Sequence, residues 1–295
     1  MPYHCAVTRF KQDYMVAKVP STAAGIHCPE CDANGTLIYD HCKNHPHWVD
    51  VDVLGDYAEK ADNVDDPKIH LANARVFSFG PTHDRCYQPP AMENVANFHL
   101  RYVKESSQVK LVEDQPFPHT LPTNSTPYFN NNSNNTGAGY DGPGECLKHV
   151  FGRGERLWAA PKVDGSLWLR MNVSEFVTDL GVGMKPSAWL FVPPQCKHSS
   201  CKLLILPGGC NAFTDDPPGG GSDDAFARYG VVNGIVILKP CQGGPIDQKR
   251  FPQNHENLRG MVDVYGQISA DYATQTGGQM APIGKMLKRL LGVEQ

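Results

Sequence analysis

The sequence predicts an α/β fold, because strands alternate with helices along the chain. Two apolar runs, 202–206 and 234–238, are typical of parallel strands that are covered on both faces. The segment between them, 223–229, has acidic residues in its first turn and predicts a connecting helix. A length of 295 residues with 40% hydrophobic content suits one large domain or two small ones, and we expect a single domain over 1–295.

Local patterns predict the remaining elements. An apolar segment at 74–79 reads as a buried strand that ends in a Gly-Pro turn. Pro90 begins a helix, and its apolar face is formed at helical spacing by Met92, Val95, Phe98 and Tyr102. Short strands are expected at 109–112, 165–170 and 188–192, a loop without regular structure at 121–145, and an amphipathic helix at 279–291.

Composition narrows the range of partners and compartments. A net charge of −4 and a pI near 6.3 give no reason to expect nucleic acid or an anionic membrane as partner. No apolar run approaches about 18 residues, so no membrane span is expected. Ten cysteines favour an oxidising, secretory setting. Five sequons, although they also arise by chance in Asn-rich loops, predict a secreted glycoprotein; they begin at Asn34, Asn124, Asn131, Asn134 and Asn172.

The N-terminal sequence does not fit that setting. Met1-Pro-Tyr-His-Cys-Ala6 has neither a basic region nor an apolar core, so it is not a signal peptide. Two interpretations stay open: the start is truncated, or the protein is not secreted.

Two residues could form part of a catalytic triad. Asp84 follows the strand at 74–79 by five residues, and His119 follows the strand at 109–112 by a similar distance. Functional side chains gather beyond the carboxyl ends of strands in open α/β sheets. A hydrolase uses the imidazole to take the nucleophile's proton and the carboxylate to orient the imidazole. The alternative is a surface turn aspartate and an ordinary loop histidine.

Glycine-rich turns offer a second candidate feature. Leu206-Pro-Gly-Gly-Cys210 follows a strand and could supply a backbone N–H to an oxyanion hole, or it is a plain strand-exit turn. The run 217–222 lacks the lysine and spacing of a phosphate-binding loop, so no cofactor is expected.

The cysteine-rich N-terminal segment allows two interpretations. Cys28-Pro-Glu-Cys31, followed by His41, Cys42, His45 and His47, resembles a zinc site. The spacing of the second half is irregular, so disulfides are preferred and no metal is predicted. Cys196 and Cys201 are expected to form a local disulfide before a strand.

The nucleophilic serine is not visible. No Gly-x-Ser-x-Gly occurs in the sequence. Ser222 has no strand directly before it, which argues against a strand-turn-helix nucleophile elbow. The nucleophile is therefore unassigned.

Taken in order, these stretches resemble the one-domain, circularly permuted poly(3-hydroxybutyrate) depolymerases and their secreted relatives, which have an α/β-hydrolase fold. His119-Thr-Leu-Pro-Thr123 is similar to the family's HTMPT around the triad histidine, and the turn ending at Asp84 to the triad aspartate turn, with one extra residue. Other matches are Met1–Ala6 (GPYYCA), 139–152, Ser174–Val177 (SEFV), 189–201, 206–210 (LHGC), 271–274 and 277–280.

The resemblance implies roles for several residues. His119 would be base and acid, Asp84 its orienter, and the amide of Cys210 part of the oxyanion hole. Asp263 and Tyr265 would contact an ester or polyester substrate. The family's GCWDWWGY motif reads Gly260-Met-Val-Asp-Val-Tyr-Gly266 here, so a cysteine and three tryptophans are lost. Cys241 is a substitute disulfide partner for Cys210, and the substrate could be a different ester.

Family members place the serine elbow shortly upstream of the segment with which this chain begins. The leading hypothesis is a secreted serine-type ester hydrolase whose nucleophile-elbow strand and helix are absent from this chain, which would make it a fragment. The alternative is a non-catalytic relative that binds a polymer or glycan, and a zinc-dependent binding module comes third. The sequence does not predict an oligomeric state.

Overall fold

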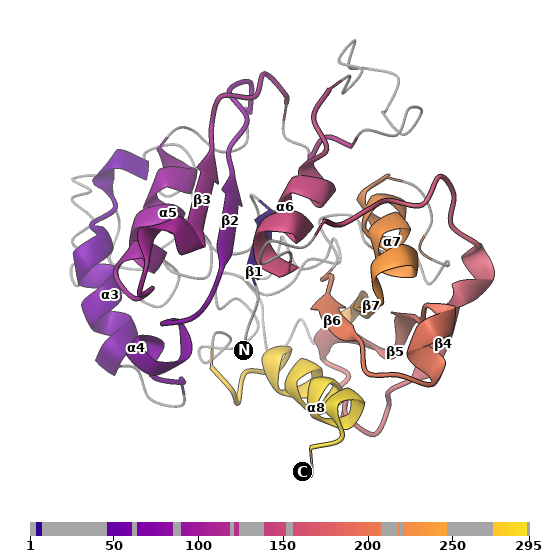
Figure 1. The fold of residues 1–295 in the computed structure, drawn as a ribbon. Coiled ribbons are helices and arrows are strands. Elements are labelled where there is room, and N and C mark those ends of the chain that lie inside the picture. The colour runs from indigo at the N-terminus through magenta and orange to yellow at the C-terminus, as the bar shows by residue number, and fades with distance from the viewer. Residues whose placement is uncertain are drawn as a thin grey trace. The chain divides into compact units, whose positions relative to one another are not determined.

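The computed structural model describes residues 4–7, 46–60, 64–84, 90–118, 121–123, 139–151, 156–207, 218, 221–246 and 274–293. Contacts divide the chain into two compact units, Met1–Arg156 and Leu157–Gln295 (Figure 1). Each unit has its own sheet and helices. The expectation of one domain over 1–295 stays a prediction.

The first unit is built on a three-stranded parallel sheet. Its order is β1 (His4–Val7), β2 (Val76–Phe79), β3 (Val109–Val112), with β2 in the centre. All four residues of β2 are buried. A central parallel strand must be covered on both faces, and its sequence, Val-Phe-Ser-Phe, is accordingly apolar apart from one small hydroxyl.

Helices cover the two faces of β2. The Ser78 hydroxyl donates to the Met92 carbonyl at 3.1 Å, so its face of the sheet lies against α5 (Ala91–Leu100). Phe77 and Phe79 point to the other face, because side chains alternate along a strand. The Phe77 ring lies under the ammonium of Lys110, which is paired with Glu145 of α6 (Gly142–Phe151) at 2.8 Å. The two helices thus bury opposite faces of the same strand.

Outer helices complete the first unit. The helix α3 (Val51–Lys60) packs on α5, and the Tyr102 hydroxyl donates to Gly55 O at 2.9 Å. Asp66 caps the short helix α4 (Pro67–His70) by accepting a bond from Lys68 N. Two 3-10 turns, η1 (Pro46–Trp48) and η2 (Ser106–Gln108), precede α3 and β3.

The second unit has a mixed four-stranded sheet. Its strands are β4 (Trp168–Asn172), β5 (Val182–Phe191), β6 (Lys202–Ile205) and β7 (Ile235–Ile246), in the order β4-β5-β7-β6. The β4/β5 and β5/β7 pairs are antiparallel, and β6 and β7 are parallel. The helix α7 (Gly221–Asn233) connects the parallel pair, as the sequence predicts.

The helix α8 (Met280–Leu291) closes the core of the second unit. Its Met286 is 1% exposed and packs with buried side chains of β5 and β7, including Met184 and Leu238. Ile283 and Leu290 pack against the same cluster. The helix ends at Gly292, whose positive φ of 66° forms a left-handed cap.

Most predicted elements are confirmed. The four residues assigned to the apolar face of α5 and its extension are all buried. The two apolar runs form the parallel pair β6 and β7, although β7 extends to Ile246.

Three predicted boundaries are wrong for local reasons. The predicted loop 121–145 includes the start of α6, because the Asp141 side chain accepts from Gly144 N at 3.0 Å and caps a helix that begins Gly-Pro-Gly. The predicted strand at 165–170 begins only at Trp168, because Asp164 caps a 3-10 turn, η3 (Gly165–Leu167). The strand predicted at 188–192 begins earlier, at Val182. The sequence did not predict this start because Lys185 and Pro186 interrupt the apolar pattern.

Candidate active site

Asp84 lies in a tight turn beyond the carboxyl end of β2. The strand ends at Phe79, and the turn Gly80-Pro-Thr-His-Asp84 closes with a bond from Asp84 N to Pro81 O at 3.1 Å. Asp84 is only 7% exposed, although it follows the exposed residues Thr82 and His83. A buried carboxylate at the end of a strand favours the interpretation of Asp84 as a functional residue over that of an exposed surface-turn aspartate.

Backbone hydrogen bonds join this turn to the segment that leads to His119. Gly80 N donates to Val112 O at 2.9 Å, Thr82 N to Gln115 O at 2.9 Å, and His83 N to Phe117 O at 3.2 Å. These bonds extend the pairing of β2 and β3 past the regular sheet. The chain segments of Asp84 and His119 therefore run side by side, within the first unit, up to Phe117.

The segment after His119 is fixed as well. Residues 119 and 120 lie outside the described residues, but Pro122 O accepts a bond from Gly142 N at 2.9 Å. Leu121 is 7% exposed, and a Cβ on Gly142 would lie 2.5 Å from Leu121 Cδ1. Glycine at 142 thus allows the start of α6 to approach this segment closely.

Three aromatic rings, from the end of β2, from the segment before His119 and from the start of α6, pack together. The rings of Phe79 and Tyr140 stack with centroids 5.5 Å apart and an interplanar angle of 24°. Tyr140 also contacts Phe117, at 6.3 Å and 43°. The Tyr140 hydroxyl is buried and has no hydrogen-bond partner among the described residues. Burial, together with the nearby carboxylates of Glu145, Asp114 and Asp141, raises the pKa of Tyr140 above its usual value.

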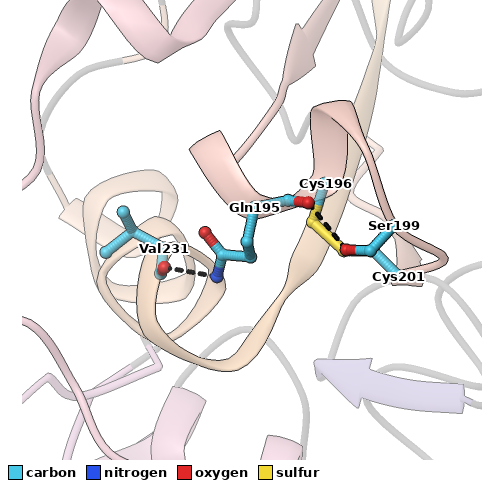
Figure 2. The surroundings of a disulfide bond; sticks show 5 residues. All are labelled: Gln195, Cys196, Ser199, Cys201 and Val231. Atoms are coloured by element: carbon cyan, nitrogen blue, oxygen red, sulfur yellow. Dashed lines mark hydrogen bonds between the residues drawn. A yellow bond between two sulfur atoms is a disulfide. The ribbon is translucent and has the colours of Figure 1, made fainter.

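The second unit contains the predicted local disulfide. Cys196 and Cys201 are bonded, with Cα atoms 5.6 Å apart (Figure 2). In the same turn, Ser199 Oγ donates to Gln195 O at 2.6 Å, and Gln195 Nε2 donates to Val231 O of α7 at 2.8 Å. The disulfide therefore staples a turn that is also tied to the end of α7.

Two other cysteines are informative. Cys146, on α6, is also disulfide-bonded. Cys241, on β7, is a buried thiol rather than half of a disulfide. The suggested pairing of Cys241 with Cys210 is therefore wrong, since β7 buries the Cys241 side chain, 7% exposed, as a thiol inside the unit.

Several predicted site residues fall outside the described residues. These are His119, Cys210, Asp263 and Tyr265, and their predicted roles stay predictions. The cysteines and histidines at 27–45 of the suggested zinc site are outside as well. Within the described ranges, no group of three or more His, Cys, Asp or Glu side chains could hold a metal ion. Ser222 lies in the first turn of α7.

The sequence interpretation missed how the site is supported. It did not predict the pairing of Thr82 and His83 with the segment 115–117, since neither segment has the alternating apolar pattern of a strand. Tyr140 lies within the stretch 139–152 that is similar to the family, but no role of its own was predicted for it. The available signal for its packing role was an aromatic residue directly before Asp-Gly-Pro, at which a helix starts.

Comparison with solved structures defines the class of fold as α/β-hydrolase-like. One match is a serine-to-alanine variant of a PHB depolymerase complexed with an R3HB trimer, with a TM-score of 0.67. Another is the PHB depolymerase from Penicillium funiculosum, with a TM-score of 0.65. Each is 17% identical, and each comparison covers 96% of this chain and 85% of the other.

Sequence comparison agrees with this class. The chain is 26% identical over 235 residues to a poly(3-hydroxybutyrate) depolymerase of Delftia acidovorans. The match covers 76% of this chain and 44% of that protein, so the chain spans less than half of its relative's length. No family model matches the chain. The chain is thus poly(3-hydroxybutyrate) depolymerase-like in sequence and in fold, as its motifs predict.

No helix among the described residues is both long enough and apolar enough to cross a membrane.

Proposed function

We propose that this chain carries the Asp–His pair of a serine-type carboxylic ester hydrolase that acts on polyesters of hydroxyalkanoic acids. The observation that carries the proposal is the backbone pairing of the Asp84 turn with the segment that leads to His119. Both residues follow neighbouring parallel strands, the position at which α/β sheets assemble their active sites.

The two side chains have complementary roles. His119 takes the proton of a serine hydroxyl as that oxygen attacks the ester carbonyl, and it returns the proton to the leaving alkoxide. Asp84 accepts a hydrogen bond from the imidazole, fixes its tautomer and stabilises its charged form. Burial of Asp84 strengthens this interaction, because the local dielectric constant is low.

The remaining parts of the site rest on the family resemblance. The Cys210 amide would stabilise the oxyanion, and Asp263 and Tyr265 would contact the substrate. The circularly permuted chain order belongs to the same proposal. Secretion is supported by the two disulfide-bonded cysteines of the Cys196–Cys201 turn and by the bonded Cys146.

A second function is favoured by one observation. The sequence contains no Gly-x-Ser-x-Gly, so no serine of this chain is assigned as nucleophile. A relative without a nucleophile would bind a polymer or glycan through the same surface without cleaving it.

Paired binding and hydrolysis assays separate the two functions. The purified protein is incubated with poly(3-hydroxybutyrate) granules and with the soluble trimer, and bound protein and released monomer are measured. For a hydrolase, His119→Ala should lower kcat by about 10⁶-fold. The matched control is His70→Ala, which removes an exposed histidine at the end of α4 and should leave kcat unchanged.

The possible outcomes differ clearly. Monomer release that depends on His119 supports the hydrolase. Release that persists in His119→Ala refutes the triad assignment. Granule binding without release, in the wild type and in His119→Ala alike, supports the binding protein.

A further inference from the structure

We propose that Tyr140 is a positioning residue for the Asp84–His119 pair. Its ring contacts both segments that carry the pair, and so fixes their spacing. This inference rests on the proposed function and names a residue for which neither the triad motifs nor the resemblance gives a role.

The first contact is made by the strand residue that leads into the Asp84 turn. Phe79 is the last residue of β2, is fully buried, and lies five residues before Asp84. Its ring stacks on Tyr140 at 5.5 Å. Because Phe79 is locked in the sheet, this contact sets the position of Tyr140 relative to the strand end.

The second contact is made by the segment that leads to His119. Phe117 precedes His119 by two residues, is 6% exposed, and contacts the Tyr140 ring at 6.3 Å. Its carbonyl also accepts the bond from His83 N. Phe117 therefore links the ring cluster to the backbone pairing next to Asp84.

Tyr140 is itself held in place by α6. The next residue, Asp141, caps the helix through bonds from Gly144 N at 3.0 Å to its side chain and from Glu145 N at 2.8 Å to its carbonyl. Since Gly142 N binds Pro122 O, the same helix start holds the chain on the far side of His119. The Tyr140 ring thus has a rigid support.

The ring, and not the hydroxyl, carries this role. The hydroxyl is buried and unpartnered among the described residues, so it weakens the fold rather than stabilising it. Replacement by phenylalanine keeps the stacking and removes only this group. Replacement by alanine removes the contacts with Phe79 and Phe117.

The test is a ¹⁵N NMR titration of the His119 ring, which needs no ester hydrolysis. The signal is assigned by its loss in His119→Ala. A nearby carboxylate favours the charged imidazole, so Asp84→Asn should lower the titration midpoint of His119 by about 1 pH unit or more. Tyr140→Ala should lower the midpoint by at least half of that shift, and Tyr140→Phe should leave it unchanged.

Two further variants control for general destabilisation. Tyr102→Ala removes a buried tyrosine near the other end of the same sheet, where Lys104 N binds Ala72 O ahead of β2. It should lower the Tm without moving the midpoint. If Tyr140→Ala does not fold, Tyr140→Leu is measured instead. It keeps an apolar side chain of similar size without the flat ring, and it should also lower the His119 midpoint.

The results distinguish this inference from the proposed function. The role of Tyr140 alone is overturned if the His119 midpoint moves in Asp84→Asn but stays at the wild-type value in Tyr140→Ala. The same holds for Tyr140→Leu where that variant replaces Tyr140→Ala. An equal shift in Tyr102→Ala also overturns it. If Asp84→Asn leaves the midpoint unchanged, the Asp84–His119 pair itself is refuted.

Discussion

The turn after β2 in the first unit and the turn before β6 in the second unit are fixed by different means. The first is held by backbone hydrogen bonds to 112–117 and by buried aromatic rings. The second is held by the Cys196–Cys201 disulfide and by the bond from Gln195 to α7. The turn that carries the candidate catalytic aspartate therefore depends on tertiary packing, whereas the stapled turn depends on a local covalent bond. Packing can orient a side chain, whereas a disulfide stabilises chiefly by lowering the conformational entropy of the unfolded chain.

The largest effect is expected from the packing that supports the first turn. Phe79→Ala removes a fully buried ring and should lower the free energy of unfolding by about 3–5 kcal/mol, as measured by urea denaturation. The control Leu100→Ala, on the exposed side of α5, should cost far less. A loss in Phe79→Ala as small as in the control would show that the turn is not supported by this core.

Removal of the staple should have a smaller and purely structural effect. The double substitution Cys196→Ser and Cys201→Ser opens a short loop and should lower the free energy of unfolding by about 2 kcal/mol. The control Ser199→Ala loses only one exposed hydrogen bond of the same turn. Stability equal to that of the wild type, or loss of ester hydrolysis where the protein has it, would contradict the assignment of a local role.

The pH dependence of the first unit provides a third test. Burial lowers the pKa of His149, despite a hydrogen bond to Gln108 O, and the charges of Arg75 and Lys110 lower it further. The unfolded chain therefore binds this proton at higher pH than the folded chain does. Stability should fall as the pH drops through about 6.5, the pKa of an unperturbed histidine.

Thermal unfolding between pH 7.5 and pH 5.5 measures this effect. In His149→Gln, which keeps a donor for Gln108 O, the Tm should fall less over this range than in the wild type. The exposed His70 of α4 serves as control, and His70→Gln should follow the wild-type curve. An unchanged slope in His149→Gln would exclude this histidine as the source.

The smallest effect is expected on the surface of the second unit. Arg289 of α8 forms an exposed ion pair with Glu175 at 3.0 Å. Solvent screens such pairs, so Glu175→Gln should change the free energy of unfolding by no more than about 0–1 kcal/mol, and less at high salt. A larger loss that persists at 1 M salt would show that α8 is held by this pair rather than by Met286.

The sequence predicted the elements well where one pattern dominated. The helical spacing from Met92 to Tyr102 and the apolar runs of β6 and β7 left few alternatives. It failed where a single capping side chain set the boundary. Asp141 begins α6 inside a Gly-Pro-rich stretch, and Asp164 delays β4, because in each case one hydrogen bond outweighs local propensity.

The candidate site was predicted in part. The sequence predicted the aspartate and its position after a buried strand. The burial of Asp84 did not follow, since a Pro-Thr-His-Asp turn reads as exposed.

The α/β class, the order of the elements and the likeness to poly(3-hydroxybutyrate) depolymerases could be read from the amino-acid sequence, because they depend on periodicity and on motif order along the chain. The pairing of the Asp84 turn with 115–117 became visible only in the folded chain, as did the shared cluster of Phe79, Tyr140 and Phe117. These contacts join segments far apart in sequence. They arise from burial of apolar surface in three dimensions, which no local pattern records.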